Sequence, residues 1–172
     1  KNACFFFQRL RTLHFNMVGI TLAATGAALA VILGGIGSIL GTGRAGSAGA
    51  GVITEDPSLF GKILLLQALP STQGIYGFIG TFWVIFKLGL LSGNIPEISW
   101  ATGLTILVAS LPVAIAGLFS AIHQSKVCIA SMNIASKNPG EVGKGIIMAA
   151  MVETYAVLGL LATILLIQGI QV

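Results

Sequence analysis

Long runs of apolar residues alternate with short polar stretches along this chain. Four runs are longer than the roughly 20 residues that an α-helix needs to cross the hydrocarbon core of a membrane. They cover approximately residues 17–42, 62–91, 99–126 and 143–170. Charged residues and prolines gather between the runs. The pattern therefore predicts an all-α membrane protein with four transmembrane helices and no large soluble domain.

The second half of the chain repeats the first at an offset of 82 residues, without a gap. The matched features include Pro57 with Pro139, Gly61-Lys62 with Gly143-Lys144, and Ala68–Gly77 with Ala150–Gly159. Shared composition alone does not place prolines and Gly-Lys pairs in register. The chain is therefore predicted to be a duplicated helical hairpin in parallel orientation, with a first hairpin over residues 17–91 and a second over residues 92–172.

Lysine and arginine are concentrated in the two loops inside the hairpins and at their edges: Arg44, Lys62, Lys126, Lys137 and Lys144. The positive-inside rule places these loops in the cytoplasm and both termini outside, near Trp83 and Trp100. Residues 1–16 conflict with this orientation because they carry further basic residues, and Met17 begins the first clean span. We therefore predict that residues 1–16 are an N-terminal extension or leader outside the fold.

Composition excludes several classes of protein. Charged residues make up 8% of the chain, whereas a soluble domain carries about 25%. The net charge of +4 is too thinly spread for nucleic acid. Cys4 and Cys128 form neither a disulfide nor a metal spacing, and the glycine-rich run 41–46 lacks the Gly-Lys-Ser/Thr ending of a phosphate-binding loop. No organic cofactor is predicted.

Glu153 is the only carboxylate in the middle of a long apolar run. An ionisable group at bilayer depth costs a few kcal/mol or more, so such residues usually face a protein interior and take part in ion transport. The alternative is a carboxylate that a local hydrogen bond keeps neutral. Polar groups in the other spans favour the first interpretation.

The second span carries a polar set on one helical face: Leu69, Thr72, Gln73 and Tyr76. Pro70 cannot donate a backbone hydrogen bond, so it loosens this turn and leaves carbonyl oxygen available at membrane depth. The third span adds Gln124. With Glu153, the set offers the oxygen ligands that hard cations prefer, and its single negative charge suits a monovalent ion. Alternatively, these groups only bond the helices to one another.

These features resemble the proteolipid subunit, K or c, of V-type and archaeal-type rotary ATPases, over residues 17–172. The stretches that carry the resemblance are Leu69–Gly77, Gly117–Gln124 and Ala149–Tyr155. The Thr72-Gln73 pair together with Gln124 is similar to the sodium-pumping branch. The resemblance implies that sodium is held by the Leu69 carbonyl, Thr72, Gln73, Gln124 and Glu153, and that Tyr76 hydrogen-bonds the glutamate. Ser71 occupies the repeat position of Glu153, which implies one site per four helices.

The resemblance also implies partners and a mechanism. Copies of the chain would form a rotor ring in the plasma membrane, surrounded by lipid, turning against a stator subunit that supplies an arginine. A central-stalk subunit would contact the cytoplasmic loops, and ATP hydrolysis or synthesis would be coupled to sodium movement through a subunit that is not itself catalytic. Two alternatives remain: a rotor subunit that carries protons on Glu153, and a four-helix membrane scaffold or small transporter.

Overall fold

The chain is helical along nearly its whole length in the computed structural model, which describes the backbone of residues 2–93 and 96–172 and the side chains of 17–93 and 96–172. The α-helices are α1 Asn2–Glu55, α2 Phe60–Ala68, α3 Thr72–Lys87, α4 Trp100–Lys137 and α5 Val142–Gln168. Short 3₁₀ turns cover Pro57–Leu59, Leu69–Ser71, Leu90–Ser92 and Pro139–Glu141. The predicted all-α fold is confirmed.

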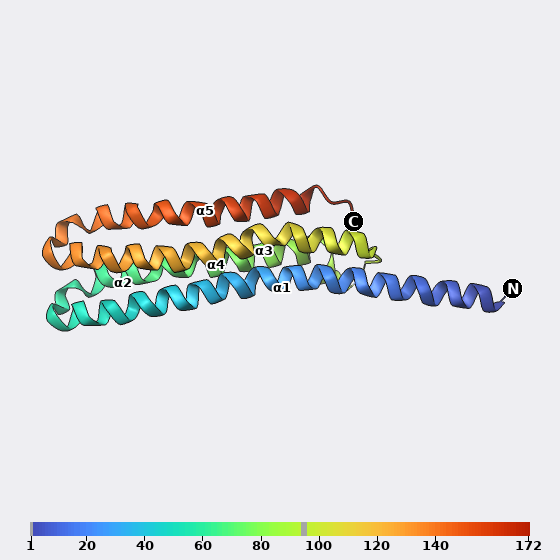
Figure 1. Ribbon diagram of the computed structural model, residues 1–172, viewed down its shortest axis with the longest axis horizontal. Helices are drawn as coiled ribbons and strands as arrows, with labels where there is room; N and C mark the ends of the chain where they lie inside the picture. The colour runs from blue at the N-terminus through green and yellow to red at the C-terminus, as the bar shows by residue number, and fades with distance from the viewer. Residues whose placement is uncertain (1, 94–95) are drawn as a thin grey trace.

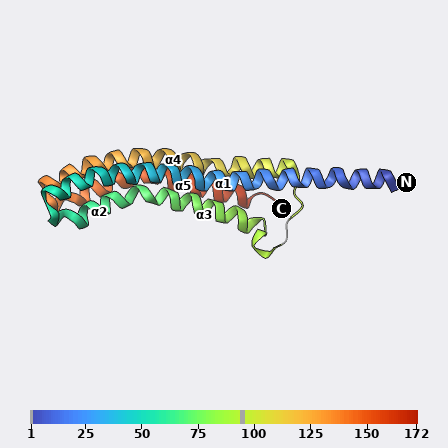
Figure 2. The same cartoon turned by 90° about the horizontal axis from the view of Figure 1, so that it is seen from below.

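The helices pack side by side in one elongated bundle. In Figure 1, α4 lies between α1 and α5. In Figure 2, α2 and α3 lie on another side of the bundle, next to α1. The most extensive contact joins α1 to α4, and α3 packs against α1, α4 and α5. Both hairpin turns lie at one end of the bundle, and the chain termini lie toward the other (Figure 1).

The two halves of the chain have matching boundaries, which confirms the duplicated hairpin. The matched boundaries, each pair 82 positions apart, are the ends of α1 and α4 at Glu55 and Lys137, the turns that begin at Pro57 and Pro139, and the starts of α2 and α5 at Phe60 and Val142. The second helix of each hairpin differs between the halves. The first half is interrupted at Pro70, whereas Val152 occupies the repeat position in the continuous helix α5.

Two helices run further than the sequence predicted. The first and third apolar runs end near residues 42 and 126, but α1 continues to Glu55 and α4 to Lys137. Arg44 and Lys126 are exposed on these helices. Their charges therefore mark a change in the environment around the helix, and the helix itself continues past them. The helices end instead just before Asp56-Pro57 and Asn138-Pro139, because a residue that precedes proline is disfavoured in the α conformation.

The first turn is held by its own side chains. Asp56 has an extended backbone with φ −139°. Its carboxylate accepts hydrogen bonds from the Ser58 hydroxyl at 2.6 Å and the Ser58 backbone N–H at 3.0 Å. These bonds lower the pKa of the Asp56 carboxyl group, and the turn fixes where the second helix of the first hairpin begins.

Three helical segments in the described part of the chain are long and apolar enough to cross a membrane: Met17–Glu55, Trp100–Lys137 and Pro139–Gln168. The fourth predicted span is divided at Pro70 into α2 and α3. Large apolar side chains such as Ile39 and Leu165 are each 72% exposed on the bundle surface. Such a surface suits lipid and not water, so the chain is a multi-pass membrane protein.

Two predictions concern residues that the structure covers only in part. The predicted boundary at residue 17 concerns residues 1–16, whose side chains lie outside the described residues, although α1 begins at Asn2. Asn94 and Ile95 in the loop between the hairpins also lie outside the described residues. The division into an extension and two hairpins at residues 16 and 91 therefore stays a prediction.

Glycines allow α1 and α4 to touch at backbone distance. A Cβ atom added at Gly37 would lie 2.7 Å from the Leu118 carbonyl oxygen, and one added at Gly103 would lie 2.1 Å from the Gly19 carbonyl oxygen. Small residues at helix interfaces permit this approach in lipid, where dispersion contacts and interhelical hydrogen bonds replace the hydrophobic effect. Gly19 and Gly37 of α1 therefore serve a contact within the chain.

Replacing Gly37 with alanine is expected to destabilise the protein by about 1–3 kcal/mol, because the new methyl group forces two backbones apart. Gly35→Ala is the matched control on the same helix. A Cβ atom at Gly35 meets nothing within 4 Å, and alanine favours the helix by up to about 1 kcal/mol. Thermal unfolding of the purified protein in detergent measures both. Equal stabilities for the two variants would contradict the close contact.

Candidate ion-binding site

Pro70 produces an irregular turn in the middle of the first hairpin's second helix. The 3₁₀ turn Leu69–Ser71 joins α2 to α3 because proline has no N–H for the helical ladder. The Thr72 N–H donates to the Leu69 carbonyl, and the Thr72 hydroxyl donates to the same oxygen at 3.0 Å. The loosened turn predicted at Pro70 is therefore present, and it gathers a hydroxyl and a carbonyl at one point.

Two glutamines connect this turn to α4. Gln73 Nε2 donates to Gln124 Oε1 at 2.7 Å, and the Thr72 hydroxyl lies 3.4 Å from Gln73 Oε1. Both glutamine side chains are completely buried. Because a buried amide without partners is costly in an apolar medium, this pair fixes the relative positions of α3 and α4.

Glu153 completes the cluster from α5. Its Oε1 accepts a hydrogen bond from the Tyr76 hydroxyl at 2.6 Å, and its Oε2 accepts one from Gln124 Nε2 at 3.2 Å. Gln124 Nε2 also lies 3.2 Å from the Ala149 carbonyl oxygen. Glu153 and Tyr76 are partly exposed whereas the glutamines are buried, so the carboxylate stands between the amides and the bundle surface.

The structure thus brings together residues that the sequence placed on three separate spans. The connected cluster contains Leu69, Thr72, Gln73, Tyr76, Gln124 and Glu153. In the described part of the chain no three His, Cys, Asp or Glu residues are close enough to hold a metal ion. The cluster offers one carboxylate and several neutral oxygens, a donor set that suits a hard cation and not the softer transition metals.

The repeat supplies no second cluster of this kind among the described residues. Ser71 stands where the other half has Glu153, and Thr42 stands where it has Gln124. The Thr42 hydroxyl is buried and has no hydrogen-bond partner in the described part of the chain. Part of the local geometry persists, since the Thr154 hydroxyl donates to the Met151 carbonyl at 2.7 Å as Thr72 does to Leu69.

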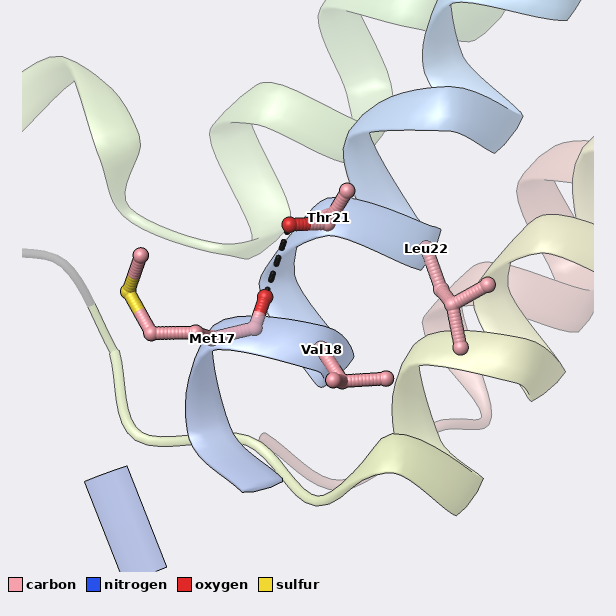
Figure 3. Close-up of a pocket in the computed structure, with 4 residues that line it drawn as sticks. All are labelled: Met17, Val18, Thr21 and Leu22. Atoms are coloured by element: carbon pink, nitrogen blue, oxygen red, sulfur yellow. Dashed lines mark hydrogen bonds between the residues drawn. The ribbon is translucent and has the colours of Figure 1, made fainter. Parts of the chain in front are cut away.

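Other polar and hollow features lie apart from the cluster. His123 is exposed beside Gln124 and lies outside the bonded cluster. A hollow of about 440 Å³ near the start of the described part of α1 is lined by Met17, Val18, Thr21 and Leu22 (Figure 3). The Thr21 hydroxyl already donates to the Met17 carbonyl at 2.7 Å. These lining residues carry no group for catalysis or for binding an ion.

Two residues, one in contact with the cluster and one beside it, were missed in the sequence. The Ala149 carbonyl has no sequence signal because every residue carries one. The Ser38 hydroxyl lies 2.8 Å from the Gly74 backbone nitrogen, but a single serine in a helix rich in glycine stands out by neither charge nor spacing. The repeat gives a weak signal, since Ser38 matches Ser120.

Comparisons with known proteins agree with this architecture. Residues 25–84 and 107–166 each match the family of the ATP synthase C subunit, and the two matches are offset by the same 82 residues as the repeat. The V-type sodium ATPase subunit K of Enterococcus hirae is 46% identical over 149 residues, which cover 87% of this chain and 92% of that protein. The A-type ATP synthase subunit K of Methanocaldococcus jannaschii is 38% identical over 151 residues, which cover 88% of this chain and 64% of that protein. The chain therefore belongs to the ATP synthase C-subunit family, as a member in which the family's helical hairpin occurs twice.

Proposed function

We propose that this chain is the ion-carrying rotor subunit of a V-type or archaeal-type rotary ATPase, and that it carries sodium on Glu153. The observation that carries the proposal is the bonded cluster in which Glu153 accepts a hydrogen bond from Gln124, which in turn accepts one from Gln73 beside the Thr72-Leu69 turn. The likeness to a protein named as a sodium ATPase subunit supports sodium as the transported ion.

The donor set favours sodium over a proton. A proton needs only the carboxylate and one hydrogen-bond partner, which Tyr76 already provides. Gln73, Gln124 and Thr72 would then serve only as hydrogen-bonded contacts between the helices, because each must find a partner at membrane depth. A sodium ion would use their oxygens as ligands, which explains why polar residues occupy these positions.

Sodium binding would control movement through lipid. With sodium bound, the charge of Glu153 is compensated and the site can face lipid; an empty, charged site is penalised there. Copies of the chain would assemble into a ring, with a stator subunit whose arginine displaces the ion. A central-stalk subunit would contact the loops around residues 56–59 and 138–141. ATP chemistry would take place elsewhere in the complex, and the chain itself would be non-catalytic.

The energy for this movement is set by the membrane potential. One elementary charge crossing 100 mV corresponds to about 2.3 kcal/mol. With one carboxylate for each pair of hairpins, the proposed ring moves fewer ions per turn than a ring of the same number of hairpins with a carboxylate in each. Fewer ions per turn favour pumping by ATP hydrolysis against a steep gradient.

Carbodiimide labelling tests the proposal, because the reagent modifies a protonated carboxyl group in an apolar site. Labelling of the purified protein is expected to concentrate on Glu153 and to fall when sodium is added at fixed pH, with potassium as the control salt. Mass spectrometry locates the modified residue. Equal labelling with and without sodium would favour proton transport. Absence of an SDS-resistant oligomer would favour the scaffold or transporter alternative.

A further inference from the structure

The interruption at Pro70 leaves a backbone N–H group near the start of α3, that of Gly74, to find its partner outside its own helix. The first four N–H groups of an α-helix lack partners within the helix. At α3, the Thr72 N–H donates to the Leu69 carbonyl across the 3₁₀ turn. The Gly74 N–H donates instead to the hydroxyl oxygen of Ser38 on α1, at 2.8 Å. Ser38 thus caps α3 from a neighbouring helix.

The same part of α1 supports the whole turn. A Cβ atom at Gly34 would lie 2.8 Å from the Gln73 carbonyl oxygen, and one at Gly41 would lie 2.8 Å from Pro70 Cβ. Ser38 lies between these two glycines and is 8% exposed. The turn that carries Thr72 and Gln73 therefore rests directly on α1, and Ser38 makes a polar contact to it.

We propose that Ser38 is a positioning residue for ion binding. Its hydroxyl fixes the backbone at Gly74, directly after Thr72 and Gln73, and so holds both side chains toward Gln124 and Glu153. Ser38 touches no ion and acts through the turn alone. The inference rests on the sodium site proposed above, and it adds α1 to the three helices that supply the cluster.

The repeat provides a matched control. Ser120 occupies the equivalent place on α4 and is also buried, at 6% exposed. Its hydroxyl lies 3.4 Å from the Gly117 carbonyl oxygen in its own helix. Ser120→Ala therefore removes a buried hydroxyl of the same kind without removing a contact to the turn.

The experiment measures the sodium concentration that gives half-maximal protection of Glu153 from carbodiimide in the assembled protein. Ser38→Ala is expected to raise it about three- to tenfold, as the loss of one buried hydrogen bond implies. Ser38→Thr keeps the hydroxyl and is expected to stay near the parent value, as is Ser120→Ala. In ion-driven turnover, the sodium concentration for half-maximal rate should rise in Ser38→Ala while the rate at saturating sodium stays near that of the parent.

Thermal stability of each variant is measured alongside, because a purely structural serine would lower stability and leave the sodium concentration unchanged. That result, or an equal shift in Ser120→Ala, would overturn the inference.

Ser38→Cys, with a weaker acceptor of similar size, takes the place of Ser38→Ala if the alanine variant does not assemble, and the same shift is expected. If sodium protects Glu153 in the parent and Ser38 variants do not differ, only the positioning role fails. Lack of protection in the parent contradicts the sodium site itself.

Discussion

Replacing Glu153 with glutamine is expected to abolish sodium-coupled turnover while the protein still assembles. Glutamine has nearly the same shape, and its amide can accept one hydrogen bond and donate another, so the contacts to Tyr76 and Gln124 can be remade. The negative charge that compensates sodium is lost. Without it, neutral oxygens alone must replace the hydration of the ion, and transport should fall to the background level.

Sodium uptake and sodium-stimulated ATP hydrolysis of the complete complex in vesicles measure this effect, with the recovery of oligomer as the assembly readout. Glu97→Gln is the control. Glu97 is exposed in the loop between the two hairpins, apart from the bonded cluster and from the loops proposed to contact the stalk. The control should transport at the parent rate. Normal transport by Glu153→Gln would show that another group carries the ion.

The second large effect is expected for Gln124→Leu. Gln124 contacts Gln73, Glu153 and the Ala149 carbonyl, so leucine removes one candidate ligand and leaves the Gln73 amide without its partner. A hydrogen bond to a charged group is worth roughly 1.5–3 kcal/mol. Sodium affinity should therefore fall by about tenfold or more. Gln73→Leu is expected to change affinity in the same direction, since it breaks the other side of the amide pair.

Binding of radioactive sodium to the isolated oligomer measures both variants. His123→Leu is the adjacent control, because His123 is exposed and lies outside the bonded cluster. It removes a polar side chain from the same helix and should leave affinity unchanged. Unchanged binding in both glutamine variants would refute the oxygen cage and leave the amides as contacts between helices.

The sequence was sufficient to predict the duplicated hairpin and the set of residues that meets at Glu153. Both depend on strong local signals: prolines in register, and polar side chains at helical spacing within apolar runs. Helix ends were less predictable. Arg44 and Lys126 were expected near the ends, but a single exposed charge can remain in a helix, and α1 and α4 end only before the next proline.

Contacts between distant helices were the least predictable feature. The first span is rich in glycine, but the sequence did not identify the helix that these glycines contact. The structure shows that Gly37 faces Leu118 and Gly19 faces Gly103. Ser38 was missed because its function depends on Gly74 on another helix. The ion ligands remain a prediction from sequence and geometry together until sodium binding is measured.

The glycine-lined contact between α1 and α4 has a mechanical consequence. Where two helices touch through backbone atoms, few flexible side chains lie between them, and close-packed protein has low compressibility and transmits strain. The two hairpins are therefore expected to move as one stiff body. In the proposed rotor, elastic twisting under torque would be concentrated at the junctions between neighbouring copies and at the stalk, and each ion site would keep its shape while the ring is under load.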